Sequence, residues 1–153
     1  MARFAPLVPL LAGALLLVLA EFLTVREIRA VTVVPPGGTE TGGGLHGYGL
    51  GLIGLAMLPM AYGAVMRGAR PAAVALLVLS IAACVIVVFV DRPVLDDTGL
   101  IGRTYDLAEA RPAVGFYLES LGAVLALVGS VATYALLPRS TRWVTPRDRT
   151  RTT

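Results

Sequence analysis

The sequence contains no lysine, one cysteine and one histidine, and only 15% of its 153 residues are charged. The single Cys84 excludes an intrachain disulfide, a cysteine zinc cluster and a CxxC redox pair. A soluble domain of this length needs a charged surface, whereas this chain is 56% hydrophobic with a mean hydropathy of +0.78. An ordinary soluble fold is therefore excluded.

Catalytic sequence motifs are also missing. The chain has no Walker A, Rossmann or HExxH pattern, and no Gly-x-Ser-x-Gly elbow surrounds any of its serines. The sequence therefore predicts neither an enzyme nor a bound cofactor.

Four long apolar runs dominate the chain, at about residues 5–25, 47–66, 71–90 and 113–137. Each is long enough to cross a hydrocarbon core of about 30 Å, which takes about 20 helical residues. Every backbone amide inside lipid must be paired within its own segment, so each run is expected to be a helix. The predicted fold is all-α: one transmembrane four-helix bundle over residues 1–137, with outer loops at 26–46 and 91–112.

The distribution of arginine predicts the orientation in the membrane. The N-terminus, the turn between the second and third runs, and the tail together hold eight arginines and one acid. The opposite side holds five arginines and nine acids. The positive-inside rule then places both termini in the cytoplasm of a multi-pass cell-membrane protein. The Arg-rich tail, residues 138–153, is expected to be disordered and to contact anionic lipid rather than nucleic acid.

The first apolar run has a second interpretation, as a secretory signal peptide. Arg3, the apolar stretch and the small-residue site ending at Ala20 resemble such a signal. The run is long for a signal peptide and continues past the site to Val25, so we expect an uncleaved helix. Cleavage would leave three helices in the same orientation.

The two outer loops differ in composition. Residues 28–34 have the β-branched character of a strand, and residues 35–44 are rich in turn residues. The Asp96–Gly99 segment of the second loop lacks the further ligands of a calcium loop and is interpreted as an acidic turn. We expect any extracellular part to be at most a hairpin or a short cap.

Small residues recur at helical spacing in two of the runs. On one face they allow another helix to approach closely, which drives packing in lipid. We expect packing within the chain, with a subunit interface as the alternative. The residues concerned are Gly47, Gly51 and Gly54 in the second run, and Gly115, Gly122, Ala126 and Gly129 in the fourth.

Four titratable residues fall at the outer ends of the four runs: Glu21, His46, Asp91 and Glu119. An ionisable group at membrane depth is costly and is a functional candidate by default. Together the four could relay protons, bind a cation or sense pH. The interpretation we favour places them at the lipid headgroups, hydrated or paired with Arg26, Arg103 or Arg111. Their sequence spacing does not predict a metal site.

Five segments carry a resemblance to a known group of proteins. They are His46–Tyr48, Pro59–Ala64, Gly68–Pro71, Asp91–Pro93 and Ala110–Glu119. Over about residues 5–137 the chain resembles small actinobacterial four-span proteins of unknown function, a likeness that implies no activity. Claudin-like proteins share only the helix count, because the first loop here lacks their tryptophan motif and cysteine pair.

Two functions follow from these patterns. The first is an accessory or scaffold protein that packs against itself or within a larger membrane complex. The second is an oligomeric proton- or cation-coupled transporter or channel. A buried group in which Glu21, His46 and Glu119 face one another would favour transport, whereas exposed side chains would favour the accessory role.

Overall fold

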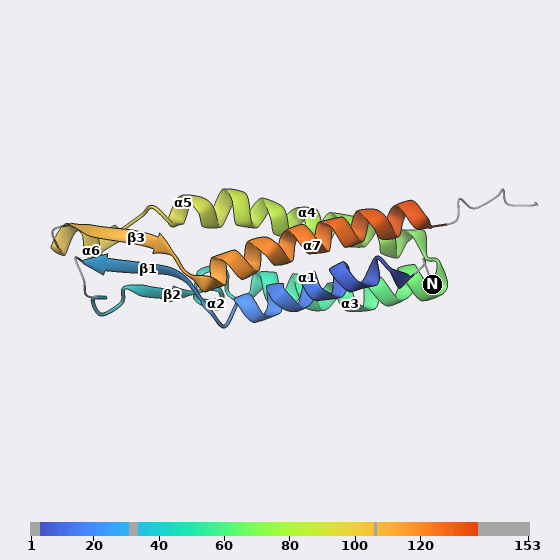
Figure 1. The fold of residues 1–153 in the computed structure, drawn as a ribbon, viewed down its shortest axis with the longest axis horizontal. Helices are drawn as coiled ribbons and strands as arrows, with labels where there is room; N and C mark the ends of the chain where they lie inside the picture. The colour runs from blue at the N-terminus through green and yellow to red at the C-terminus, as the bar shows by residue number, and fades with distance from the viewer. Residues whose placement is uncertain (1–3, 31–33, 106, 138–153) are drawn as a thin grey trace, which may run out of the picture.

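The computed structural model describes residues 4–30, 34–105 and 107–137. The predicted tail, residues 138–153, lies outside this description. Long helices run side by side along most of the molecule, and a small sheet projects from one end (Figure 1).

The helical part is a four-membered bundle. Its long helices are α1 (Leu7–Ala20), α3 (Gly49–Arg67), α4 (Arg70–Ile86) and α7 (Val114–Leu136). The helix α4 continues through a π-helix, η2 (Val87–Asp91), into the short α5 (Arg92–Val94). Each long helix packs against two others, in the cyclic order α1, α3, α4, α7.

Three helical stretches are long and apolar enough to cross a membrane, namely Gly49–Arg67, Arg70–Thr104 and Val114–Leu136. The apolar α1 is shorter, at 14 residues. The predicted continuation of this first helix to residue 25 is not observed, because the chain turns at Glu21 and a strand begins at Thr24.

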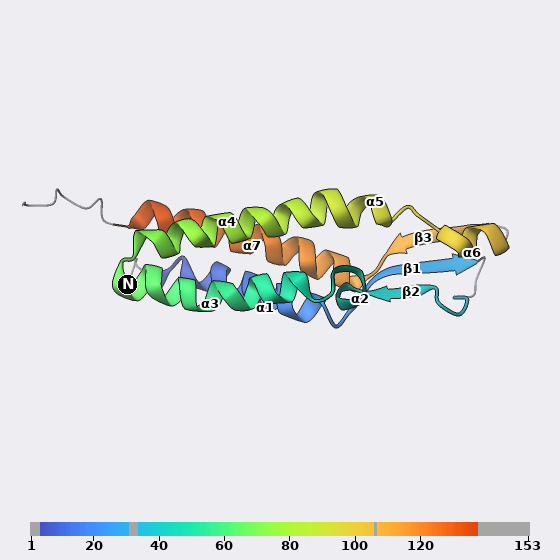
Figure 2. The same ribbon diagram turned by 180° about the vertical axis from the view of Figure 1, so that it is seen from behind.

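The turn between α3 and α4 follows from two residues. Gly68 adopts a left-handed conformation, with φ of 65°, and donates its backbone N–H to the carbonyl of Gly63. Two residues later Arg70 begins α4, and Pro71 lies in its first turn, where the missing N–H of proline costs no helical bond. This short turn holds α3 and α4 antiparallel (Figure 2).

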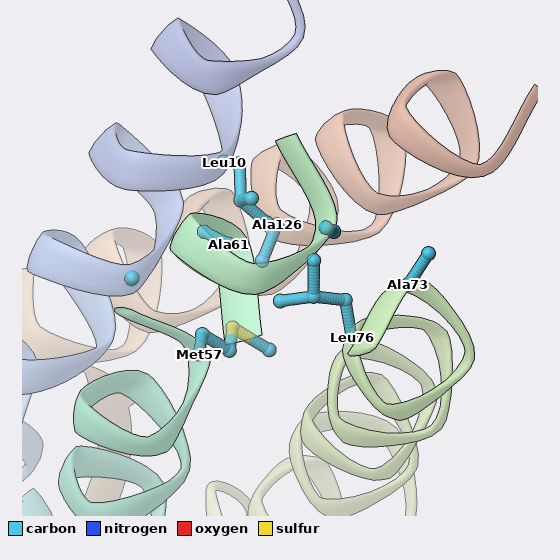
Figure 3. Packing of buried hydrophobic residues seen from close by; sticks show 8 residues of the cluster. Leu10, Met57, Ala61, Ala73, Leu76 and Ala126 are labelled. Carbon is cyan, nitrogen blue, oxygen red and sulfur yellow. The ribbon is translucent and has the colours of Figure 1, made fainter. Parts of the chain in front are cut away.

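The bundle core is built from small side chains with a few large ones between them. At one level Leu10, Met57 and Leu76 meet around Ala61 and Ala126 (Figure 3). A second cluster lies closer to the sheet. Its buried members are Leu17, Leu50, Ala83, Val87 and Ala123. The outward faces of the helices are also apolar, as expected for a bundle that lies in lipid.

The glycines of α7 lie against α1 and the start of the strand that begins at Thr24. A Cβ added to Gly129 would lie 2.6 Å from the backbone nitrogen of Leu10, and one added to Gly115 would lie 2.7 Å from the carbonyl oxygen of Thr24. In α3, a Cβ on Gly54 would lie 2.7 Å from the carbonyl oxygen of Ala14. These small residues therefore pack helices within the chain.

Gly47 does not belong to this packing surface, contrary to the sequence interpretation. It adopts a left-handed conformation, with φ of 58°, between α2 (Gly42–His46) and α3. A Cβ at this position would meet open space. Its role is to reverse the chain after His46, which the spacing of glycines alone does not distinguish from helix packing.

The projecting end is an antiparallel three-stranded sheet with the order β2-β1-β3. Its strands are β1 (Thr24–Ala30), β2 (Thr39–Thr41) and β3 (Ala108–Pro112). The all-α prediction is therefore incomplete. The strand character of residues 28–30 was visible in the sequence, whereas β3 came from a segment expected to be a loop. A short helix, α6 (Gly99–Thr104), packs near β3.

A buried histidine and carboxylate cluster at the sheet end of the bundle

The end of α1 fixes the first of the four candidate residues. The chain turns after Ala20 through hydrogen bonds from Phe22 to Leu19 and from Leu23 to Ala20, which places Glu21 at the turn. The carbonyl of Glu21 accepts a 2.8 Å hydrogen bond from the backbone N–H of Gly43. The segment that carries His46 is thereby attached to the end of α1.

Glycines allow α2 to lie this close. A Cβ on Gly42 would lie 2.9 Å from the carbonyl oxygen of Ala20, and one on Gly43 would lie 2.5 Å from the ring of Tyr48. Thr41 caps the helix, because its Oγ1 accepts a 3.2 Å hydrogen bond from the N–H of Gly44. The glycine run, which the sequence predicts to be a loop, therefore forms the short helix that ends at His46.

His46 bonds directly to the carboxylate of Asp91, through Nε2 and Oδ1, and both side chains are almost fully buried. This hydrogen bond raises the pKa of His46, and burial of the imidazole opposes the rise. The negative charges of Asp91 and Glu21 add to the increase.

The π-helix η2 presents Asp91 to the cluster. Asp91 is its last residue and lies on the same buried side as Val87, with 0% exposure, whereas Arg92 is exposed. Pro93 follows two residues later and has no N–H to donate to the preceding turn, a recognised cause of local departure from α-helical bonding. Such π turns occur frequently at functional sites.

Glu119, in the second turn of α7, completes the cluster. Its side chain is 1% exposed, and neither carboxylate oxygen has a hydrogen-bond partner among the described residues. One ligand atom from each of His46, Asp91 and Glu119 lies within 4.8 Å of the other two. Gly115 and Gly122 flank Glu119 and let α7 lie close to the start of β1 and to α1, so the carboxylate is enclosed by protein.

This enclosure contradicts the favoured interpretation that the carboxylates are hydrated or paired with arginine at the headgroups. Arg26 instead bonds Glu40, at 2.6 Å, and Arg111 bonds Glu109, at 2.7 Å. The chain pairs these arginines within its sheet, away from Glu119.

Glu21 lies beside the three-residue cluster and has a different contact. It is buried, and its Oε1 accepts a 2.7 Å hydrogen bond from the backbone N–H of Gly51, in the first turn of α3. The first N–H groups of a helix have no partner within it and favour a carboxylate. Glu21 therefore caps α3, and its Oε2 has no partner in the described part of the chain.

One residue near the cluster had a role that the sequence did not indicate. Arg26 of β1 donates through Nη1 to the carbonyl oxygens of Val94, at 3.0 Å, and Asp97, at 2.9 Å. Together with its bond to Glu40, this ties the segment that follows Asp91 to the sheet. The local sequence does not indicate these contacts, because the partners lie 14 to 71 residues away along the chain.

A pocket of about 200 Å³ lies between the α4–η2 helix and α7, next to the cluster. It is lined largely by apolar side chains, including those of Val88 and Phe116, with Arg92 at its wall. Phe116 and Ser120, which also line it, are close neighbours of Glu119 in the sequence.

Electrostatics restrict what this arrangement can do. Asp91, Glu119 and Glu21 bring three carboxylates together, with one imidazole as their basic neighbour among the described side chains. A buried charge must be paired, neutralised by a proton or bound to a metal ion. The cluster is therefore suited to holding protons or a cation.

Comparison with known proteins gives no match: no protein-family model, no curated protein and no solved structure matches the chain. The fold defines a helical protein with three candidate membrane-spanning helices.

Proposed function

We propose that the protein is a four-span protein of the cell membrane, with both termini in the cytoplasm, that takes up protons or cations at the outer end of its bundle. The arginine distribution supports this orientation. A fourth span is supported by the path of the N-terminal segment. Residues 10–24 lie along α7 from Gly129 to Gly115, so that α1 and its following turn run beside a helix long enough to cross the membrane.

The observation that carries the proposed activity is the mutual approach of His46, Asp91 and Glu119 in a buried site that has no arginine partner in the described structure. A carboxylate enclosed in this way is costly to keep charged unless a bound cation offsets the charge or a proton neutralises it. An accessory role alone does not require this cost. Coupling of transport to a proton or metal ion does.

The described helices of a single bundle leave the bundle centre packed. The side chains of Leu10, Met57 and Leu76 fill the bundle centre (Figure 3). We therefore propose that transport takes place in an oligomer or through movement of the helices, with the cluster as the outer binding point.

Flux through proteoliposomes that contain the purified protein tests this proposal. With an internal pH-sensitive or metal-sensitive dye, the wild type is expected to take up protons or a divalent cation, and Glu119→Gln is expected to lose that uptake. Glu109→Gln is the matched control, because Glu109 is an exposed carboxylate of the sheet. Absence of wild-type flux, or equal flux in Glu119→Gln, would overturn the proposal.

The accessory or scaffold role is a second candidate, and a different observation favours it. Leu100, in α6, and Leu107, directly before β3, are 77% and 84% exposed at the end of the molecule that holds the sheet. A contiguous exposed apolar patch outside lipid marks a binding surface, and we propose that these two leucines contribute to one. A mild-detergent pull-down, read by mass spectrometry, should recover a partner with the wild type and lose it with Leu100→Ser and Leu107→Ser.

A further inference from the structure

The three closest side chains of the cluster form the donor set of a transition-metal site. We propose that one imidazole nitrogen of His46 and one carboxylate oxygen from each of Asp91 and Glu119 bind a single divalent cation of the zinc type. This inference rests on the proposed uptake of cations at the same place and names the ion class. It uses donors from three elements that are far apart in the sequence, α2, η2 and α7.

Distance supports a shared ion. The three donor atoms lie within 4.8 Å of one another. Nitrogen and oxygen ligands lie about 2.0–2.2 Å from zinc, so two ligands at the tetrahedral angle are about 3.4 Å apart. Entry of the ion therefore requires that the side chains rotate, so that the direct His46–Asp91 hydrogen bond opens and the three donors surround the ion.

The second observation is that buried carboxylate oxygens of the cluster have no hydrogen-bond partner among the described residues. The carboxylate of Glu119 is 1% exposed with both oxygens unpartnered within the described chain, and Oδ2 of the fully buried Asp91 is also unpartnered. Buried polar atoms are normally satisfied, and a group left without a partner needs an explanation. A cation placed between the donors gives each of the two buried carboxylates a partner.

Charge and donor type select the ion. Asp91 and Glu119 carry two negative charges when ionised, so a divalent ion gives a neutral site whereas a monovalent ion leaves an excess charge in a low-dielectric place. An imidazole nitrogen suits zinc and its neighbours, whereas magnesium and calcium prefer oxygen ligands only. Three protein ligands leave a fourth position for water.

Calorimetric titration of the tag-free, full-length protein in detergent with Zn²⁺ tests the assignment, after metal is removed with a chelator. We expect one ion per chain. Glu119→Gln and His46→Gln should each weaken binding at least about 10-fold, because each removes one of three ligands. Co²⁺ titration adds a spectroscopic signature, since its visible absorption reports nitrogen and oxygen coordination. Glu109→Gln should bind like the wild type.

Folding of each variant is checked by size-exclusion chromatography. Where Glu119→Gln does not fold, Glu119→Asp, which keeps the charge and shortens the reach, takes its place and should also weaken binding. Absence of Zn²⁺ binding to the wild type, or binding unchanged in the folded ligand variants, would overturn the inference.

The binding and flux experiments can fail separately. Proton flux without Zn²⁺ binding removes the metal site and leaves the proposed function. Zn²⁺ binding without any flux leaves the metal site and removes transport.

Discussion

Gly13 of α1 and Gly122 of α7 face each other at backbone contact. A Cβ on Gly13 would lie 2.7 Å from the carbonyl oxygen of Gly122, and a Cβ on Gly122 would lie 3.1 Å from that of Gly13. This reciprocal contact makes the α1–α7 approach depend on both glycines. It also positions the α7 segment that carries Glu119.

The first prediction follows from this contact. Gly122→Leu should lower the free energy of unfolding by about 1–3 kcal/mol or more, because a branched side chain forces the two backbones apart. Thermal unfolding in detergent measures the effect. Val128→Leu, at an exposed position of the same helix, is the control. Equal melting temperatures for the two variants would remove support for the contact.

The second prediction concerns Arg26. Arg26→Gln should weaken the attachment of residues 95–105 to the sheet, because it removes the bonds to Val94, Asp97 and Glu40. Hydrogen bonds from charged groups contribute about 1.5–3 kcal/mol each at most. Hydrogen exchange should rise in this segment. Arg111→Gln, which removes only an exposed pair, should leave exchange there unchanged, and an unchanged pattern in Arg26→Gln would refute the attachment.

The third prediction is a pH dependence of stability at His46. Its pKa is raised in the folded protein by Asp91, with contributions from Glu21, so protonated imidazole stabilises the fold. This contribution is fully present below the unfolded pKa of about 6.5 and is lost as pH rises through the higher folded pKa. Glu119, which also faces His46, adds negative charge when ionised.

Melting curves of wild type and His46→Gln, recorded with chelator from about pH 5.5 to 9, measure this contribution. The stability advantage of the wild type should shrink as pH rises. A constant difference over this range would contradict the raised pKa.

The fourth prediction is topology. In a Cys84→Ala background, cysteines at Thr39 and Asp96, both exposed in the structure, should react with a membrane-impermeant reagent in intact cells. A cysteine at Thr150 should react only after lysis. The reverse labelling pattern would invert the proposed orientation.

The fifth prediction is that the N-terminal segment is retained. Leu10 and Leu17 are fully buried, and Gly129 lies against Leu10, so cleavage after Ala20 would expose the packing face of α7. Intact mass spectrometry of the purified protein should show residues 1–20 present. A chain that begins at Glu21 would exclude α1 from the functional bundle.

Hydrophobicity alone located the helical part of the fold, because a helix is the local solution to pairing the backbone in lipid. The sheet was only half visible. Residues of β1 include β-branched strand formers, but β3 has the sequence Ala-Glu-Ala-Arg-Pro and becomes a strand by pairing with β1. Long-range pairing overrides weak local preference in this segment.

The sequence indicated which residues belong to the candidate cluster, but it did not indicate that their side chains are buried in protein. The outer ends of the four runs brought Glu21, His46, Asp91 and Glu119 to one level. Two contacts distinguish their buried environment from the predicted one. Arg26 bonds Glu40 instead of a cluster carboxylate, and a glycine-rich segment brings His46 close to the end of α1. Neither contact leaves a periodic pattern in the sequence. Counting charges therefore predicted that the carboxylates pair with arginines, whereas those arginines pair with glutamates of the sheet.

The π turn before Arg92 holds one more residue per turn than an α-helix accommodates. Conversion of Val87–Asp91 to α-helical bonding would rotate the residues beyond it by about 100° relative to α4, which is the angular step of one helical residue. Such a rotation would carry Asp91 away from His46. Deletion of Val88 should restore α-helical bonding without this rotation, because a π turn is how a helix absorbs one extra residue, and Zn²⁺ binding should therefore survive the deletion.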